Sequence, residues 1–182
     1  MINDEDRTYI GSPHPDLVLG LNVKLNYKNF DLGMFFNGSF GNDIYNLTKY
    51  KTQFFNQSAY NKDSSLLGAW TPENPNSDIA RLSLDDANNN IRPSSYYVEN
   101  GSYLKLNNLQ LGFTLPEYVL SAANLRLYVQ ASNVFTITDY SGMTPEIGLQ
   151  NYSSSSRNLD IGVDRGIYPP SRTFVFGFNL NF

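Results

Sequence analysis

The sequence predicts an all-β fold, an antiparallel meander of five long strands of the kind that forms a transmembrane β-barrel. Three observations predict it. Apolar and polar residues alternate with a period of two in five segments, which is typical of strands with one apolar and one polar face. The connections between these segments are alternately short and long, and aromatic residues gather near the ends that the short connections join.

The first two strands are expected near 15–29 and 30–40. Both alternate for longer than most soluble strands and suit a tilted membrane strand of roughly ten residues. Lys28 and Asn29 lie between them and predict a tight hairpin. The apolar face consists of Leu17, Leu19, Leu21, Val23, Leu25 and Tyr27 in the first strand and of Phe30, Leu32, Met34, Phe36 and Phe40 in the second.

The third and fourth strands are expected near 103–115 and 125–138. In the third strand the apolar phase slips between Leu106 and Leu109, which predicts a β-bulge near Asn107 and Asn108. The short stretch "PEYVLSAAN" connects the two strands. The apolar positions of the fourth strand are Leu125, Leu127, Val129 and Ala131.

The fifth strand is expected near 172–182, in the stretch "RTFVFGFNLNF". Small and mostly polar residues separate its apolar ones, so the strand has one strongly aromatic face. That face consists of Phe174, Phe176, Phe178, Leu180 and Phe182.

Two long connections, near 41–101 and 139–171, separate the pairs of strands. The first contains "NDIYNLTKYKTQFFNQ", in which Ile44, Leu47 and Phe54 recur near helical spacing after a possible cap at Asn42 or Asp43. This loop is therefore expected to be partly helical. The later stretch "GAWTPENPNSDIARLS" is rich in Pro, Asn and Ser, which indicates an irregular loop.

A soluble β-sandwich would show the same alternation if its apolar faces packed a core. The connections favour the barrel, because transmembrane barrels have short periplasmic turns and long extracellular loops. Tyr27, Phe30, Phe113 and Phe182 would then form an interfacial girdle at the periplasmic end. The alternative is a secreted β-sandwich that binds carbohydrate. In either fold, three aromatic residues of the first long loop could stack on sugar rings, although an anchoring role in the loop or packing on a partner protein is favoured. They are Trp70, Tyr96 and Tyr97.

The composition excludes several classes of function. The chain has 182 residues, enough for one domain, and its low charged fraction of 16% with a net charge of −4 argues against nucleic-acid binding. Without cysteine it has neither disulfides nor a thiolate metal site. Its start, "MINDEDRTYI", does not resemble a secretory signal, and no apolar run is long enough for a transmembrane helix.

The sequence predicts no catalytic residue, metal site or cofactor, and hence no enzyme. The single histidine, His14, lies in the probable turn "SPHP" outside the strands, whereas an outer-membrane phospholipase would need a Ser/His pair on adjacent strands. The acidic pairs Asp85–Asp86 and Asp160–Asp164 could ligate calcium but lack the spacing of an EF-hand loop.

Five stretches together resemble the SusC/RagA family of TonB-linked outer-membrane transporters, and they extend over nearly the whole chain. Such an ordered series is more specific than any single short motif. The stretches are "GSPHPDLVLGLNVKLNYKNFDLGMFFNGSFGNDIYN", "WTPENPNSDIARLS", "SSYYVENGSYLKLNNLQLGFTLP", "LRLYVQASNVFTITDYSGMTPEIG" and "GVDRGIYPPSRTFVFGFNLNF".

The resemblance implies a fragment from the carboxy-terminal end of a barrel domain, comprising its last five strands and lacking the plug domain. Five strands leave two unpaired edges and cannot close a barrel. The parent would lie in the outer membrane of a Gram-negative bacterium and import glycan oligomers or peptides. The partners implied are a SusD-like surface lipoprotein, TonB through the missing amino-terminal part, outer-membrane lipid, and the barrel-assembly machinery, which would read Phe174, Phe176, Phe178, Leu180 and Phe182 as its signal.

Overall fold

A computed structural model describes residues 3–54, 61–116, 123–148 and 160–182. The chain divides into two compact units. The loop unit consists of Met1–Pro13, Asp43–Asn100 and Ser141–Ile167, and the sheet unit of His14–Asn42, Gly101–Tyr140 and Tyr168–Phe182.

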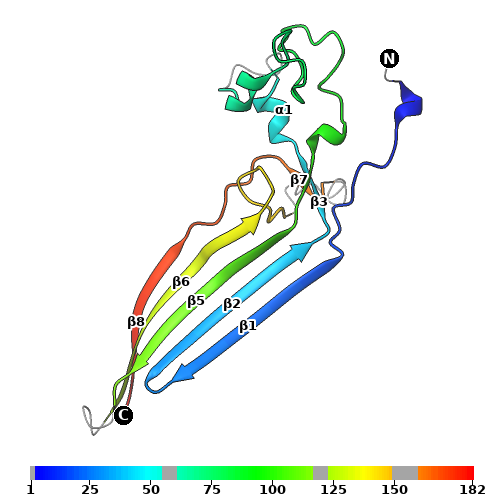
Figure 1. Ribbon diagram of the computed structural model, residues 1–182. Helices are drawn as coiled ribbons and strands as arrows, with labels where there is room; N and C mark the ends of the chain where they lie inside the picture. Colours follow the sequence, from blue (N-terminus) through cyan, green and yellow to red (C-terminus); the bar gives the residue numbers. More distant parts are fainter. Residues whose placement is uncertain (1–2, 55–60, 117–122, 149–159) are drawn as a thin grey trace. The chain divides into compact units, whose positions relative to one another are not determined.

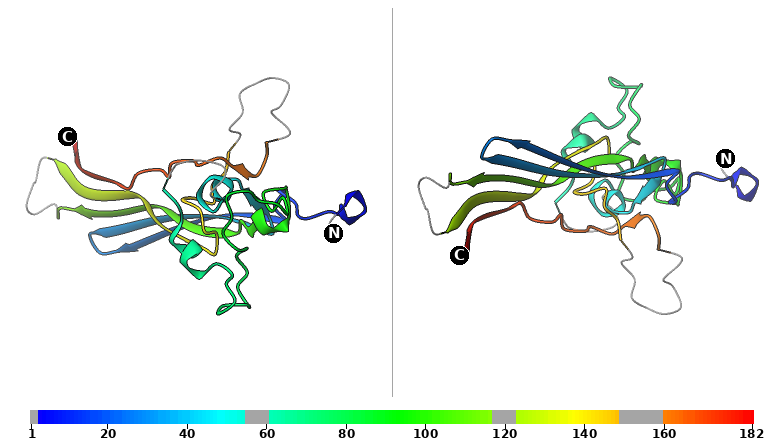
Figure 2. Two further views of the ribbon diagram at one scale, coloured as in Figure 1. Left: turned by 90° about the horizontal axis from the view of Figure 1, so that it is seen from above. Right: turned by 90° about the horizontal axis from the view of Figure 1, so that it is seen from below.

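The sheet unit is one five-stranded antiparallel sheet with the strand order β1-β2-β5-β6-β8 (Figure 1). Viewed from above and below, it forms a single twisted layer (Figure 2). The predicted strand bounds differ from the observed ones by at most two residues at either end. The strands are β1 (Leu17–Tyr27), β2 (Phe30–Phe40), β5 (Tyr103–Thr114), β6 (Asn124–Thr138) and β8 (Thr173–Asn181).

Apolar side chains form continuous rows across one face of this sheet. The strand register places Leu25, Leu32, Leu111, Val129 and Phe176 side by side, and Tyr27, Phe30, Phe113, Leu127 and Phe178 in the next row. The rings of Phe30 and Phe113 lie 4.7 Å apart between centroids.

Seven apolar residues distributed over four strands show how exposed this face is. Leu19, Leu21, Leu127, Phe176 and Phe178 are exposed, and Phe176 keeps 80% of its surface open. Met34 and Phe36 are half-buried among their row neighbours.

The predicted bulge is confirmed at Asn107, which has no partner in the register with β2 or β6. The slip keeps Leu106 and Leu109 on the same face. A second irregularity, at Asn133 of β6, was not predicted. Asn133 has a φ of 55°, a conformation that asparagine tolerates better than most residues, and its side chain donates a hydrogen bond of 2.9 Å to the carbonyl of Ser171.

An ion pair extends across three strands on the polar face. Arg126 of β6 donates two hydrogen bonds, of 2.9 and 2.5 Å, to the carboxylate of Asp31 of β2. The pair passes directly over Gly112 of β5, where a Cβ atom would collide with both side chains. Tyr128 lies in the same way over Gly177 of β8, and a Cβ there would come within 2.5 Å of its ring. Glycine at these two positions gives the long side chains room to lie flat on the sheet.

The loop unit contains a small mixed sheet that the sequence did not predict. β3 (Asp43–Asn46) pairs antiparallel with β4 (Val98–Asn100) and parallel with β7 (Val163–Asp164). Short helices accompany it, namely η1 (Asp4–Asp6), α1 (Thr48–Thr52), η3 (Ser64–Gly68) and η4 (Ser95–Tyr97).

The helix expected after Asn42 or Asp43 is therefore much shorter than its pattern suggested. Residues 43–46 form a strand, and the helix begins only at Thr48, after Leu47. Ile44 is buried within the small sheet, because pairing with two distant strands overrides the local helical spacing. No helix among the described residues is both long and apolar enough to cross a membrane.

Candidate functional site

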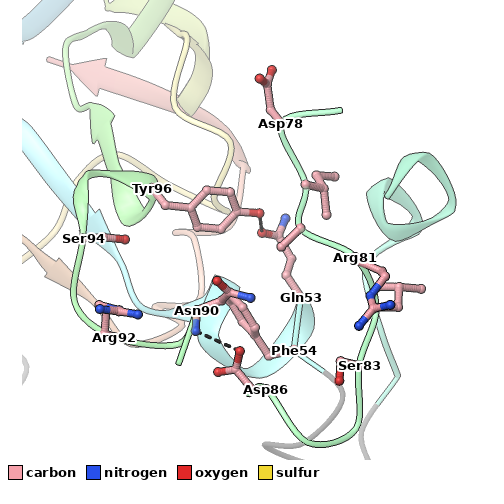
Figure 3. Close-up of a pocket in the computed structure, with 13 residues that line it drawn as sticks. Gln53, Phe54, Asp78, Arg81, Ser83, Asp86, Asn90, Arg92, Ser94 and Tyr96 are labelled. Atoms are coloured by element: carbon pink, nitrogen blue, oxygen red, sulfur yellow. Dashed lines mark hydrogen bonds between the residues drawn. The ribbon is translucent and has the colours of Figure 1, made fainter. Parts of the chain in front are cut away.

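The loop unit encloses a cavity of about 220 Å³. Its walls come from three segments, which are the end of α1 with the residues after it, the extended stretch 78–83, and the turn 86–96 (Figure 3). The lining residues are Gln53, Phe54, Asp78, Ile79, Ala80, Arg81, Leu82, Ser83, Asp86, Asn90, Arg92, Ser94 and Tyr96.

Tyr96 forms a wall that is held in place from several sides. Its hydroxyl donates a hydrogen bond of 2.5 Å to Oε1 of Gln53 (Figure 3). The Nζ atom of Lys49 lies 5.2 Å from the centre of its ring and donates to its carbonyl oxygen at 3.3 Å. Burial raises the pKa of Tyr96, with smaller contributions from the negative charges of Asp63 and Glu99, so the hydroxyl stays protonated and can donate.

Glu99 of β4 fixes Lys49 in turn. The two side chains form an ion pair of 2.8 Å, and Glu99 also accepts hydrogen bonds from the side chain of Asn46 and from the backbone and hydroxyl of Ser141, each at 2.9 Å. Burial alone would raise the pKa of Glu99, but these hydrogen bonds outweigh it and hold the pKa below its ordinary value. One carboxylate thus joins β3, α1 and the second long loop.

The other walls are shaped by local hydrogen bonds. Asp86 accepts from the backbone amides of Asn90 at 2.8 Å and Ile91 at 3.1 Å, which closes the turn. Arg92 donates to the carbonyl oxygens of Asn88 and Asn89. The carbonyl of Ile79 accepts from the backbone amide of Trp70 at 2.9 Å, which holds the stretch 78–83 in place.

The structure separates the three aromatic residues that the sequence singled out. Tyr96 lines the cavity, whereas Trp70 does not, although it is 36% exposed. Tyr97 is fully buried, donates from its hydroxyl to the carbonyl of Ile91 at 3.2 Å, and packs against Tyr45 with centroids 5.3 Å apart. A substrate contact through Tyr97 would require this packing to open.

The five residues proposed as an assembly signal lie along β8 and directly after it. The first four are exposed on the apolar face of the strand, and Phe182, just beyond it, is 99% exposed. Their role in assembly stays a prediction. The five are Phe174, Phe176, Phe178, Leu180 and Phe182.

The residues considered for calcium binding, and the histidine, have structural surroundings. Asp160 and Asp164 are buried, and Asp164 ends β7. Asp160 accepts from Arg165 at 3.0 Å, and Asp164 accepts from the amides of Gly166 at 2.8 Å and Ile167 at 3.1 Å. Across the described ranges no group of three or more acidic or histidine side chains is placed to hold a metal ion. His14 is exposed ahead of β1.

Several residues of this site carried no signal in the sequence. Phe54 was predicted, but only as part of a helical face. Lys49, Gln53 and Glu99 meet through pairings between segments that are about 50 residues apart, and single-sequence periodicity does not report such pairings. Had the pairing of β3 with β4 been predicted, Glu99 in β4 and Lys49 shortly after β3 would have been expected to lie close together.

Comparison with known proteins gives a consistent set of relatives, although no family model matches the chain. The TonB-dependent receptors P3 and P26 of Formosa agariphila are 40% and 34% identical to it over 100% of the chain, and the TonB-dependent receptor SusC of Bacteroides thetaiotaomicron is 26% identical over 100%. The chain spans 18%, 18% and 16% of the length of these receptors.

Solved structures agree. The RagAB peptide transporter matches 90% of the chain with a TM-score of 0.71 and 29% identity, and the closed-closed state of the RagAB peptide importer matches 94% with a TM-score of 0.75 and 28% identity. The chain covers 17% and 18% of those structures. These relatives are receptors and an importer rather than enzymes, in line with the sequence prediction. Along its full length, the chain is therefore homologous to the SusC/RagA family of TonB-dependent receptors.

Proposed function

We propose that the chain is part of the barrel wall of a TonB-dependent transporter in the outer membrane, and that it forms the last five strands of a closed barrel. The apolar face of the five-stranded sheet would contact lipid, and the polar face would line the lumen. The observation that carries this proposal is the set of continuous apolar rows across five antiparallel strands, which the structure leaves exposed.

Soluble domains rarely expose so large a contiguous apolar surface. A secreted β-sandwich would bury such a face against a second sheet, so the exposed rows disfavour that alternative. The polar face carries the charged and amide side chains expected beside water, including Asp31, Gln110, Arg126 and Gln130. The alternation along β6 places Val129 toward lipid and Gln130 toward the lumen.

We propose that the whole transporter imports peptides or glycan oligomers together with a SusD-like surface lipoprotein. Similarity to the RagAB peptide importer supports the import of peptides and the need for a second component. TonB, acting through a part of the protein outside these residues, would supply the energy, and the barrel-assembly machinery would insert the protein. Of the three loop aromatic residues considered for substrate contact, Tyr96 lines the cavity and Trp70 is partly exposed, so these two would serve that role.

Cysteine labelling of neighbouring residues on β6 tests the barrel assignment. The 182 residues contain no cysteine. Any label found on this part of the protein would therefore come from the introduced Val129→Cys or Gln130→Cys. In outer membranes from cells that make the full-length protein, a membrane-impermeant maleimide should label Gln130→Cys and spare Val129→Cys. A lipid-soluble maleimide should label Val129→Cys.

Two results would contradict the barrel. Equal labelling of both positions by the impermeant reagent would mean that both faces of the sheet meet water. Protection of Val129→Cys from both reagents, with release of the protein into buffer without detergent, would favour the β-sandwich.

A further inference from the structure

We propose that the cavity in the loop unit is a subsite for one apolar side chain of a peptide substrate, an inference that rests on the transporter function proposed above. The cavity measures about 220 Å³. Pockets that enclose a whole small molecule usually measure about 300–1,000 Å³. The cavity therefore fits one unit of an oligomer rather than a complete ligand.

The lining favours an apolar unit over a sugar ring. The apolar lining residues are Phe54, Ile79, Ala80 and Leu82, in addition to the ring of Tyr96. A sugar ring presents several hydroxyl groups, and each hydroxyl left without a partner in such a site costs binding free energy. An aliphatic or aromatic side chain has no such requirement.

Three polar side chains of the walls are already engaged. Gln53 accepts from the Tyr96 hydroxyl at 2.5 Å, and its amide group donates to Oγ of Ser65 at 3.3 Å. The carboxylate of Asp86 accepts two backbone amides, and Arg92 donates to two backbone carbonyls. A sugar that used these three side chains would have to break these bonds, whereas an apolar side chain can fill the space and leave them intact.

The charges at the edge of the cavity suit a peptide. Asp78 and Arg81 are exposed and carry opposite charges three residues apart on one wall. A peptide brings both signs of charge in its termini or charged side chains, whereas a neutral glycan brings neither. Since Lys49 and Gln53 already hold Tyr96 in place, a ligand does not have to order this wall when it binds.

A random hexapeptide library provides the test. The full-length transporter, purified in detergent, is mixed with the library, and the peptides that it retains are sequenced by mass spectrometry. We expect apolar residues to be enriched about tenfold at one position, the scale expected for burying one such side chain. Ala80→Trp, which fills the cavity from an exposed loop position, should abolish the enrichment.

Leu67→Trp is the matched control. Leu67 lies in the same unit, is 94% exposed and does not line the cavity, so its replacement should leave the enrichment unchanged. A mixture of malto-oligosaccharides serves as the glycan probe, and neither variant should affect its retention.

The inference is overturned if the library shows no enrichment, if no peptide is retained, or if Ala80→Trp leaves the enrichment intact. If the wild type retains the oligosaccharides and Ala80→Trp does not, the cavity binds a sugar instead. These outcomes are separate from failure of the barrel assignment, because the cysteine labelling on β6 would remain normal in a transporter that lacks this subsite.

Discussion

Glu99 illustrates how one side chain can organise a loop at the residue scale. It contacts Asn46, Lys49 and Ser141, which belong to three segments far apart in the sequence. Lys49 in turn contacts Tyr96, so the position of the cavity wall depends on the charge of a residue that does not line the cavity.

We expect this network to weaken in acid. The folded-state pKa of Glu99 lies below the ordinary value of 4.5, because the hydrogen bonds to its carboxylate outweigh the effect of burial. The stabilisation is therefore fully present above pH 4.5 and is lost as the pH falls through the lower, folded-state pKa. In the full-length protein, hydrogen exchange of the segment around Ser141 should accelerate over that range beyond the intrinsic effect of pH.

Glu99→Gln is the comparison for this experiment. The variant should exchange faster at neutral pH and show no further acceleration in acid. The Lys28–Asn29 turn, in the other unit, serves as the internal reference. A pH dependence that persisted in the Gln variant would assign the titration to another group.

Gly112 provides a second prediction at the residue scale. Gly112→Ala would place a methyl group where Asp31 and Arg126 meet, so the ion pair must shift or open. We expect a loss of about 1 kcal/mol or less, since the pair is partly exposed. The folded fraction of the full-length protein on heat-modifiable gels should therefore fall at a lower temperature than in the wild type.

Gly33→Ala serves as the control for Gly112→Ala. Gly33 lies on the same polar face, in β2, and a Cβ atom there would meet nothing within 4 Å. Its replacement should leave the transition unchanged. Equal effects of the two substitutions would mean that the loss comes from strand glycines in general rather than from the ion pair.

At the scale of elements, variants of β8 can distinguish two roles of its aromatic side chains, which are contact with the surroundings and recognition during assembly. Phe174 and Phe182 lie at opposite ends of the strand and are 61% and 99% exposed, so each contributes a similar ring to the apolar surface. If this strand is read during assembly, deleting Phe182 from the full-length protein should lower the amount of folded barrel far more than Phe174→Ala. Heat-modifiable gel mobility of outer-membrane fractions measures that amount. Equal amounts in the two variants would reduce Phe182 to a lipid-facing side chain.

The long strands could be predicted from the sequence, and the loop elements could not. Alternation along β1, β2, β5, β6 and β8 is unambiguous because each strand has one mostly apolar and one mostly polar face. The slip at Asn107 was visible because it displaced Leu109 from the expected phase. The slip at Asn133 was not visible in the sequence, because the small residues Ala131 and Ser132 before it are compatible with either face of the strand.

The loop strands β3, β4 and β7 have two to four residues each, too few for a period to emerge. The segment 43–46 reads as the start of a helix in isolation and becomes a strand only because two distant segments pair with it. For the same reason, the contacts that form the cavity could not be predicted from the sequence. Tyr96 could be suspected from its residue type, but the contacts that place it against Gln53 and Lys49 depend on the tertiary fold.

At the scale of the whole molecule, the two faces of the sheet should respond oppositely to charge. Phe176→Arg would put a guanidinium on the surface proposed to face lipid and should cost about 2–4 kcal/mol near the centre of the membrane. Val175→Arg, one residue earlier and on the polar face, should cost little. Denaturant unfolding of the full-length protein in lipid vesicles measures both, and similar costs would argue against a membrane-facing surface.

The neighbouring bulges in β5 and β6 affect the curvature of the wall. Between the row of Met34 and the row of Phe36, β2 advances by two residues, whereas β5 advances from Leu109 to Leu106 and β6 from Ala131 to Phe135. Each bulged strand bends and twists more strongly at that level. The extra residues of β5 and β6 thus lie at one level of the sheet, between the same two rows of side chains. If the sheet forms part of a closed barrel, as proposed above, this level is where the wall would change its curvature.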